Sequence, residues 1–271
     1  MDNDCFEMCD YAKAENIMTS RYVAKWKFVK NPKTGKMDRT IRMRLVLRGF
    51  MDTEAFSVDT YAGTAKRTSQ RILASQAACH SEFLTASLDI DKAFLKGYSY
   101  KELAAATGEK ERVVCFKLPP GSAALLRRIH PKFKDFDEAK HCLRCVRPGT
   151  GTKDAPRAFS LKLREVTTRL GLKPCSFDPE LEFKDDLITA KHVDDVHVTG
   201  TRKAIEQYVA AIEKVFGPCK MNETQYTNCC VQYTRQPNGD VVMDQDAYIK
   251  QLLSLIHISE PTRLRRISYA V

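Results

Sequence analysis

The stretch that most constrains the fold runs from Leu187 to Gly200 and reads LITAKHVDDVHVTG. Its apolar and β-branched residues predict two short strands, Leu187 to Val193 and Val196 to Thr199. Only two carboxylates, Asp194 and Asp195, separate these strands. Adjacent carboxylates repel and Asp is depleted in strands, so stability alone does not account for them. Carboxylate oxygens are preferred ligands of Mg²⁺, and the stretch therefore predicts a cation-binding hairpin.

Such a cation needs a ligand from another strand, and Asp89 is the candidate. Thr85 to Ile90 reads as a buried strand that contains this acid, and a helix is expected over Arg67 to Phe83. One acid from an earlier strand and two from a later hairpin are typical of polymerases that use two metal ions. Two other interpretations stay open. Asp89 would then be a cap or turn residue, and Asp194–Asp195 would be a solvated turn pair, which is how we interpret Asp185–Asp186.

Four sequence boxes carry a resemblance to a known family. They are, in chain order, RMRLVLRGF (Arg42 to Phe50), LDIDKAFLKG (Leu88 to Gly97), GTGTKDAPRAF (Gly149 to Phe159) and HVDDV (His192 to Val196). Each resembles a box of the reverse transcriptases of copia-type retrotransposons. Their order and spacing match that family over most of the chain.

The resemblance implies an α+β fold, with a reverse-transcriptase palm of antiparallel sheet and packed helices, a fingers subdomain and a truncated thumb. It implies an RNA- and DNA-templated DNA polymerase that uses two Mg²⁺ ions, or Mn²⁺ in their place. Asp89 and Asp194 would bridge the metals, Asp195 would be the supporting acid, and Ile90 would offer its backbone. The partners would be a primed RNA or DNA template, deoxynucleoside triphosphates, and the ribonuclease H and integrase of the same polyprotein.

The resemblance also implies three nucleotide contacts in this chain. Phe94 would place its ring against the sugar and exclude a 2′-hydroxyl, although it could instead be an ordinary core residue. Arg44 would bind the triphosphate, because a guanidinium matches phosphate oxygens bidentately. Gly151 would allow the backbone to approach the nucleotide closely. Arg42 and Arg48 could contact template or be plain surface charge.

Nucleic-acid contacts are implied for Lys153, Arg157 and His192. Three features depart from the family pattern. His192 stands where the family has Tyr or Phe, Asp154 replaces a Gln, and Thr227 to Cys230 lacks the residues of the family's primer grip. These departures motivate an alternative function, a catalytically inactive relic that only binds nucleic acid.

Composition fits a nucleic-acid partner. The 271 residues carry a net charge of +10, with a pI of about 9.1, which suits a polyanion. No apolar run approaches the ~20 residues that a membrane span needs, so no membrane partner is expected. Ten scattered cysteines without a secretory signal indicate reduced thiols. We therefore expect an intracellular protein, in cytoplasmic virus-like particles, in the nucleus or in both.

The pair Cys142 and Cys145, next to His141, raises the question of a zinc site. A structural zinc site needs four ligands, and no second paired motif follows at a suitable spacing. We therefore interpret these cysteines as ordinary thiols. Trp26, the only tryptophan, is interpreted as part of the fingers core.

The chain divides into three expected segments. Residues 1–20 form a polar N-terminal segment with a frayed start, and residues 21–252 form the fingers, the palm and the start of a thumb. Residues 253–271 contain LSLIHISEPTR and ISYAV, which resemble the translation of a sequencing adapter, so we interpret them as read-through and not as protein.

Other elements follow from periodicity and from turn residues. Strands are expected over Arg21 to Lys30, Arg39 to Leu47, Arg112 to Leu118, Gln225 to Gln232 and Val241 to Met243. Helices are expected over Pro156 to Leu170 and Ala204 to Phe216, and a loop with helical turns over Ser122 to Lys140.

Overall fold

The computed structural model describes residues 5–31 and 34–253. The chain forms two compact units, each built from two stretches. The first unit comprises the chain up to Ala62 together with Lys92–Glu165, and the second comprises Gly63–Asp91 together with the chain from Val166 onward. Helices and antiparallel strands occur in both units, so the chain has a mixed α+β fold. The segment expected to be adapter-derived lies, apart from Leu253, outside the described residues.

The first unit is built around a five-stranded sheet with the order β1-β6-β5-β2-β3. Its strands are β1 (Phe6–Asp10), β2 (Ile17–Lys30), β3 (Met37–Leu47), β5 (Cys115–Lys117) and β6 (His141–Cys145). Its helices are α2 (Tyr100–Thr107), α3 (Ala123–Ile129), most of α4 (Ala155–Arg169) and the short 3₁₀ turns η1 (Tyr11–Lys13), η2 (Gly49–Met51), η3 (Ala93–Lys96) and η4 (Pro131–Phe133).

One face of this sheet forms the core of the first unit. Met18, Phe116 and Leu143 are essentially inaccessible there, and Phe6 packs edge-on against the Phe116 ring with 5.0 Å between centroids. The expectation of a frayed N-terminus is wrong for residues 6–10. They form β1 because its backbone pairs along the whole length of β6 and places Phe6 against this core.

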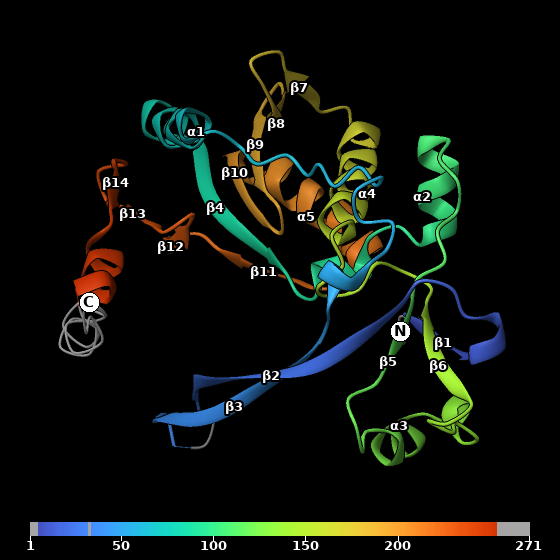
Figure 1. Cartoon of the computed structure of the whole chain (residues 1–271). Coiled ribbons are helices and arrows are strands. Elements are labelled where there is room, and N and C mark those ends of the chain that lie inside the picture. Colours follow the sequence, from blue (N-terminus) through green and yellow to red (C-terminus); the bar gives the residue numbers. More distant parts are fainter. Residues whose placement is uncertain (1–4, 32–33, 254–271) are drawn as a thin grey trace, which may run out of the picture. The chain divides into compact units, whose positions relative to one another are not determined.

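Strands β2 and β3 pair antiparallel as a long two-stranded ribbon (Figure 1). The sequence predicted this ribbon from its alternating pattern, and the structure confirms it. The interpretation of Trp26 as core is wrong, because it is 58% exposed, with the Arg39 guanidinium 4.0 Å from its ring centre. The strand expected over Arg112 to Leu118 is shorter, being confined to β5.

The second unit contains a six-stranded sheet with the order β11-β4-β10-β9-β8-β7, in which every neighbouring pair is antiparallel. Its strands are β4 (Phe83–Ile90), β7 (Lys173–Cys175), β8 (Asp178–Lys184), β9 (Leu187–His192), β10 (Asp195–Thr201) and β11 (Cys219–Asn222). Helices α1 (Arg67–Cys79) and α5 (Arg202–Phe216) pack against β4 and β10. A three-stranded sheet, β12 (Gln225–Asn228), β13 (Val231–Arg235) and β14 (Val241–Asp244), and a helix over 246–253 follow.

The helix and strand predictions for this unit hold with two corrections. Helix α1 ends at Cys79, four residues earlier than expected, because His80 is already extended and Phe83 starts β4. The single strand expected over Gln225 to Gln232 is two strands. Cys229 and Cys230, with φ of 49° and 64°, form the turn between β12 and β13.

Candidate active site

Asp194 and Asp195 of the hairpin lie next to Asp89. Asp195 begins β10 and is directly opposite Asp89 of β4 in the antiparallel register. Residues opposite each other in such a pair have Cβ atoms ~4.5–5.5 Å apart on the same face. Asp194 precedes Asp195 in the turn from β9. The fold of the second unit therefore brings Asp89, Asp194 and Asp195 to one end of two neighbouring strands.

The electrostatics of Asp195 reflect this arrangement. Burial raises the pKa of its carboxyl above the ordinary value, and the charges of Asp194 and Asp89 raise it further, while His192 lowers it. Like charges close together disfavour ionisation, so this cluster stores repulsion that a bound cation would relieve. Such a perturbed group among other acids is typical of a functional site.

The turn that carries Asp194 has an unusual backbone. Val193 has a φ of 58°, which a β-branched residue rarely adopts, and such a residue costs on the order of 1–3 kcal/mol. Continuous pairing of β9 with β10, and of β10 with β4, holds this conformation in place. The strain is thus located one residue before Asp194.

The donor atoms suit a hard cation such as Mg²⁺, because carboxylate oxygens are its usual protein ligands. The three carboxylates do not form one compact ligand set. Within residues 5–31 and 34–253, three or more possible ligand atoms come within 4.8 Å of one another at a cluster of cysteines and not at these acids. The acids are therefore spread more widely than a site for one ion requires. Ile90 has a side chain that is 1% exposed, so only its backbone could face a ligand there.

His192 lies beside the acids on β9. It is opposite Asp195 in the register and forms an isolated bridge with Thr64. Its ring is half-buried, and Nδ1 is buried without a hydrogen-bond partner among the described residues. The structure thus gathers four of the residues singled out from the sequence, three acids and one histidine.

The remaining predicted residues belong to the first unit. Arg44 is exposed on β3 and lines a groove of about 390 Å³. Three further cations line the same groove, namely Lys25, Lys27 and Arg42. None of the four forms an ion pair within the described part of the chain, so the groove presents uncompensated positive charge. Phosphate groups are the natural ligands of such a surface.

Gly151 has a structural reason for being glycine. Its φ is +101°, and a Cβ there would collide with the carbonyl oxygen of Leu47. A Cβ on Gly49 would collide in turn with the carbonyl oxygen of Gly151. Gly151 therefore allows a close backbone approach to the end of β3, and its approach to a nucleotide stays a prediction.

Arg157 is buried and ion-paired within the first unit. Its side chain is 10% exposed, and it bonds both oxygens of Glu109 at 2.9 and 3.1 Å and pairs with Asp59 at 3.2 Å. These bonds raise the pKa of its guanidinium, and carboxylates of the first unit neutralise its charge. The nucleic-acid contact expected of Arg157 stays a prediction, and a phosphate would have to compete with these two carboxylates. Lys153 remains exposed, with Nζ 5.1 Å from the centre of the Phe56 ring.

Asp154 does not present its charge to a nucleic acid. It is fully buried and paired with Arg112, which also binds Asp52 at 2.7 Å and Glu54 at 3.0 Å. No local pattern could indicate the role of Arg112, because its partners lie 42 to 60 residues away in the chain. The Arg112 guanidinium therefore neutralises the charge that this departure from the family pattern introduces.

Phe94 is half-buried in η3.

Sequence reasoning also missed a buried network behind Asp195. His197, two residues further along β10, bonds Gln70 through Nδ1 at 2.7 Å. Its Nε2 lies 2.9 Å from the Thr85 hydroxyl and 2.8 Å from that of Tyr226. Burial lowers the pKa of His197 to about 3, so the ring is neutral. The network ties β10 to α1, β4 and β12.

The turn between β12 and β13 comes close to the acids. Burial raises the pKa of the Cys229 thiol to about 11, and the charge of Asp195 contributes to this increase. This turn lies within Thr227 to Cys230, the segment that lacks the primer-grip residues of the family that the chain resembles. The segment therefore lies beside the acids although its residues differ.

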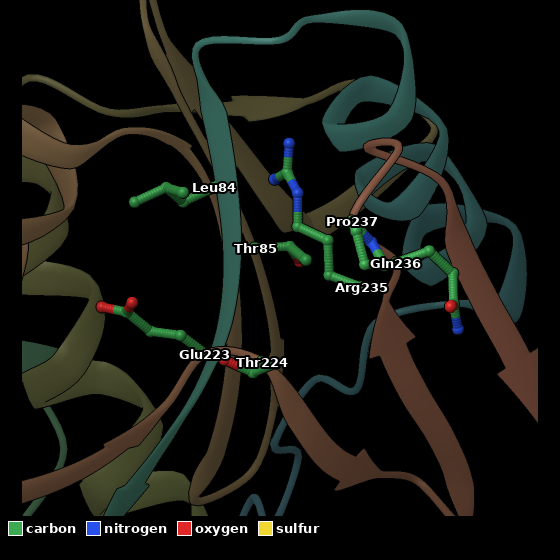
Figure 2. Close-up of a pocket in the computed structure, with 7 residues that line it drawn as sticks. All are labelled: Leu84, Thr85, Glu223, Thr224, Arg235, Gln236 and Pro237. Carbon is green, nitrogen blue, oxygen red and sulfur yellow. The ribbon is translucent and has the colours of Figure 1, made fainter.

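A cavity of about 280 Å³ lies at the other end of β4. Figure 2 shows the residues that line it, Leu84, Thr85, Glu223, Thr224, Arg235, Gln236 and Pro237. Leu84 precedes Asp89 by five residues, and a strand rises ~3.3 Å per residue. The cavity is thus roughly 16 Å from the acids along the strand and is separate from the candidate site.

No protein-family model and no curated protein matches the chain. Among solved structures it is similar to apo telomerase from Candida tropicalis truncated from the C-terminal domain, at 8% identity and a TM-score of 0.43, covering 88% of this chain and 57% of that one. It is also similar to telomerase from Candida albicans in complex with a fragment of telomeric RNA, at 10% identity and a TM-score of 0.41, covering 93% and 53%. The chain thus spans little more than half the length of either. In the described residues, none of the helices has the length and apolar character to cross a membrane.

Proposed function

We propose that this chain is the fingers and palm of a copia-type reverse transcriptase, an RNA- and DNA-templated DNA polymerase. The observation that carries the proposal is the register of β4 and β10, which sets Asp195 opposite Asp89 with Asp194 beside them. The four ordered boxes and the basic groove on β2 and β3 support it independently. Its substrates would be a primed template and deoxynucleoside triphosphates.

Two Mg²⁺ ions, when bound, would lower the pKa of the primer hydroxyl and neutralise the leaving pyrophosphate. The chain's own contribution is position and charge. Asp89 and Asp194 would hold the ions, and Asp195 would be the supporting acid beside them. The groove around Arg44 would neutralise phosphate charge, because guanidinium and ammonium groups bind phosphate oxygens.

The primary test is primer extension on a poly(rA)·oligo(dT) template with Mg²⁺. Replacing Asp194 with Asn, or Asp89 with Asn, keeps the side-chain shape but removes a charged ligand, so we expect incorporation to fall at least about 100-fold, or ~2.7 kcal/mol in the barrier. The matched control is Asp185→Asn, which removes an acid from the turn at the opposite end of β9. Equal rates for Asp194→Asn and the control would exclude the assigned site.

A second prediction concerns the sugar. If the Phe94 ring excludes a 2′-hydroxyl, Phe94→Ala should raise ribonucleotide incorporation relative to deoxyribonucleotide by about one to two orders of magnitude, at ~1.4 kcal/mol per decade. The control is Leu95→Ala, which truncates the neighbouring half-buried side chain of η3. If Phe94→Ala loses activity toward both sugars equally, Phe94 is a core residue.

The alternative function is an inactive relic that binds nucleic acid without catalysis. His192 and the altered β12–β13 segment favour it, whereas the pairing of Asp154 with Arg112 removes one of its arguments. Binding that weakens steeply with salt fits both functions. Only a polymerase should bind a primed template more tightly when Mg²⁺ and the matching nucleotide are both present. Absence of this tightening, together with no extension, would establish the relic.

A further inference from the structure

Three cysteines meet on one face of the first unit's sheet. Cys9 lies on β1, Cys142 on β6 and Cys115 on β5, three neighbouring strands. Cys9 is directly opposite Cys142 in the register. Cys115 is opposite Arg144, two residues beyond Cys142 and therefore on the same face. Their sulfur atoms all lie within 4.8 Å of one another.

This group differs from the pair that the sequence suggested. Cys142 and Cys145 are three residues apart on a strand, so their side chains point to opposite faces. Cys145 packs in the core with Phe116 and Leu143. His141 also leaves the group, because its Nε2 lies 3.3 Å from Asp10. The adjacent motif therefore forms no site, whereas the fold assembles one from strands that are distant in sequence.

We propose that Cys9, Cys115 and Cys142 bind one soft, thiophilic cation of the Zn²⁺ class. Zinc–sulfur bonds are ~2.3 Å long, which places the sulfurs of a tetrahedral site ~3.8 Å apart. The group needs only side-chain adjustments of about 1 Å to reach that geometry. Hard ions such as Mg²⁺ prefer oxygen and are excluded by an all-sulfur set.

Burial and charge fit this assignment. Cys115 and Cys142 are fully buried, while Cys9 is half-exposed and leaves a path for an ion. No fourth His, Cys, Asp or Glu joins the group in the part of the chain that the structure describes, so solvent on the Cys9 side would complete the coordination. Each thiol that coordinates releases its proton to solvent, and three thiolates with one divalent ion leave a single negative charge. Lys117 lies two residues from Cys115 on the same face and brings a positive charge near it, whereas Arg144 is already paired with Glu7 and Glu111.

The same thiols are poor candidates for a reactive nucleophile. Burial raises the pKa of Cys142 to about 12 and that of Cys115 above its ordinary value, so neither is a thiolate near neutral pH without a cation. A disulfide between Cys9 and Cys142 is the main competitor, because the two face each other across the strands. It would consume two of the three ligands, and the test below separates the two.

The experiment uses the full chain with its exposed thiols removed, as Cys79→Ser, Cys229→Asn and Cys230→Gly. Asn and Gly suit the positive φ of the last two positions. The protein is reduced, freed of reductant without oxygen, and titrated with Zn²⁺ against a chromophoric chelator. We expect one ion per chain, thiolate charge-transfer absorption when Co²⁺ replaces Zn²⁺, and a higher melting temperature with Zn²⁺.

Serine at position 9, 115 or 142 should each weaken Zn²⁺ binding by about 100-fold or more, because a thiolate ligand is lost. Cys9→Ser is the decisive variant, since a half-exposed side chain can be changed without disturbing the core. Cys145→Ala is the matched control and should keep the parent affinity. The proposal is overturned if Cys9→Ser binds as the parent does or if Cys145→Ala loses as much. It also fails if the reduced parent binds no ion, or if Cys9 and Cys142 stay disulfide-linked after reduction. The result does not depend on polymerase activity.

Discussion

Replacing Arg112 with alanine is expected to lower the free energy of unfolding of the first unit by about 3–5 kcal/mol. Its guanidinium neutralises Asp52, which is 4% exposed, and Asp154, which is fully buried. Without it, both carboxylates would lose their cation and could not reach water. Burial and these carboxylates act on the guanidinium in opposite directions, and the net effect raises the pKa of Arg112. The charge is therefore permanent.

Chemical denaturation followed by circular dichroism and by Trp26 fluorescence measures this loss, because the only tryptophan lies in the first unit. Arg112→Lys should recover part of the stability, since it keeps the charge but not the planar fork that reaches several partners. The matched control is Arg202→Ala. Arg202 pairs with Glu223 at 3.1 Å on the surface, where solvent screens the two charges, so its loss should change stability little. A loss below about 1 kcal/mol for Arg112→Ala would mean that water reaches the two acids.

The sequence predicted the elements whose signals are local. The alternating β2–β3 ribbon, helix α5 with Gly217 after its end, and the β9–β10 hairpin all depend on neighbours a few residues apart. The turn at Cys229 and Cys230 was missed because cysteine is no turn signal. Tertiary pairing, and not local preference, places both in the left-handed region.

The candidate site also has parts that the sequence predicted and parts that it could not predict. Asp89, Asp194 and Asp195 could be identified as a group because family boxes name them, and the register of β4 with β10 brings them together. The sequence could not indicate that Arg157 would be taken up by Glu109, 48 residues away. Nor could it indicate that three cysteines on separate strands would meet. Contacts of that kind depend on the topology of the fold, and composition and periodicity carry no information about it.

Lowering the pH from 7 to 4 is expected to destabilise the second unit by about 3 kcal/mol through His197 alone. In the unfolded chain a histidine has a pKa of ~6.5, whereas burial lowers the pKa of His197 to about 3 in the fold. Between these values the unfolded chain binds a proton that the folded chain excludes. Stability is therefore complete above pH ~6.5 and falls by ~1.4 kcal/mol per unit below it. The groups that face the ring do not offset this, because burial raises the pKa of Tyr226 and Tyr233 and keeps both neutral.

The variant His197→Gln removes this titration while offering an amide to the same hydroxyls, so its stability should change much less between pH 7 and pH 4. His80→Gln is the control, since His80 is exposed and should leave the wild-type slope unchanged. Denaturant midpoints measured at each pH give the slopes. Amide hydrogen exchange along β10 should accelerate in step, because Gln70, Thr85 and Tyr226 hold that strand through His197. Asp195 lies two residues away on the same face, so loosening this network moves a candidate metal ligand. If His197→Gln retains the full wild-type slope, the acid lability comes from the carboxylates, and the ring is not the group that anchors the strand.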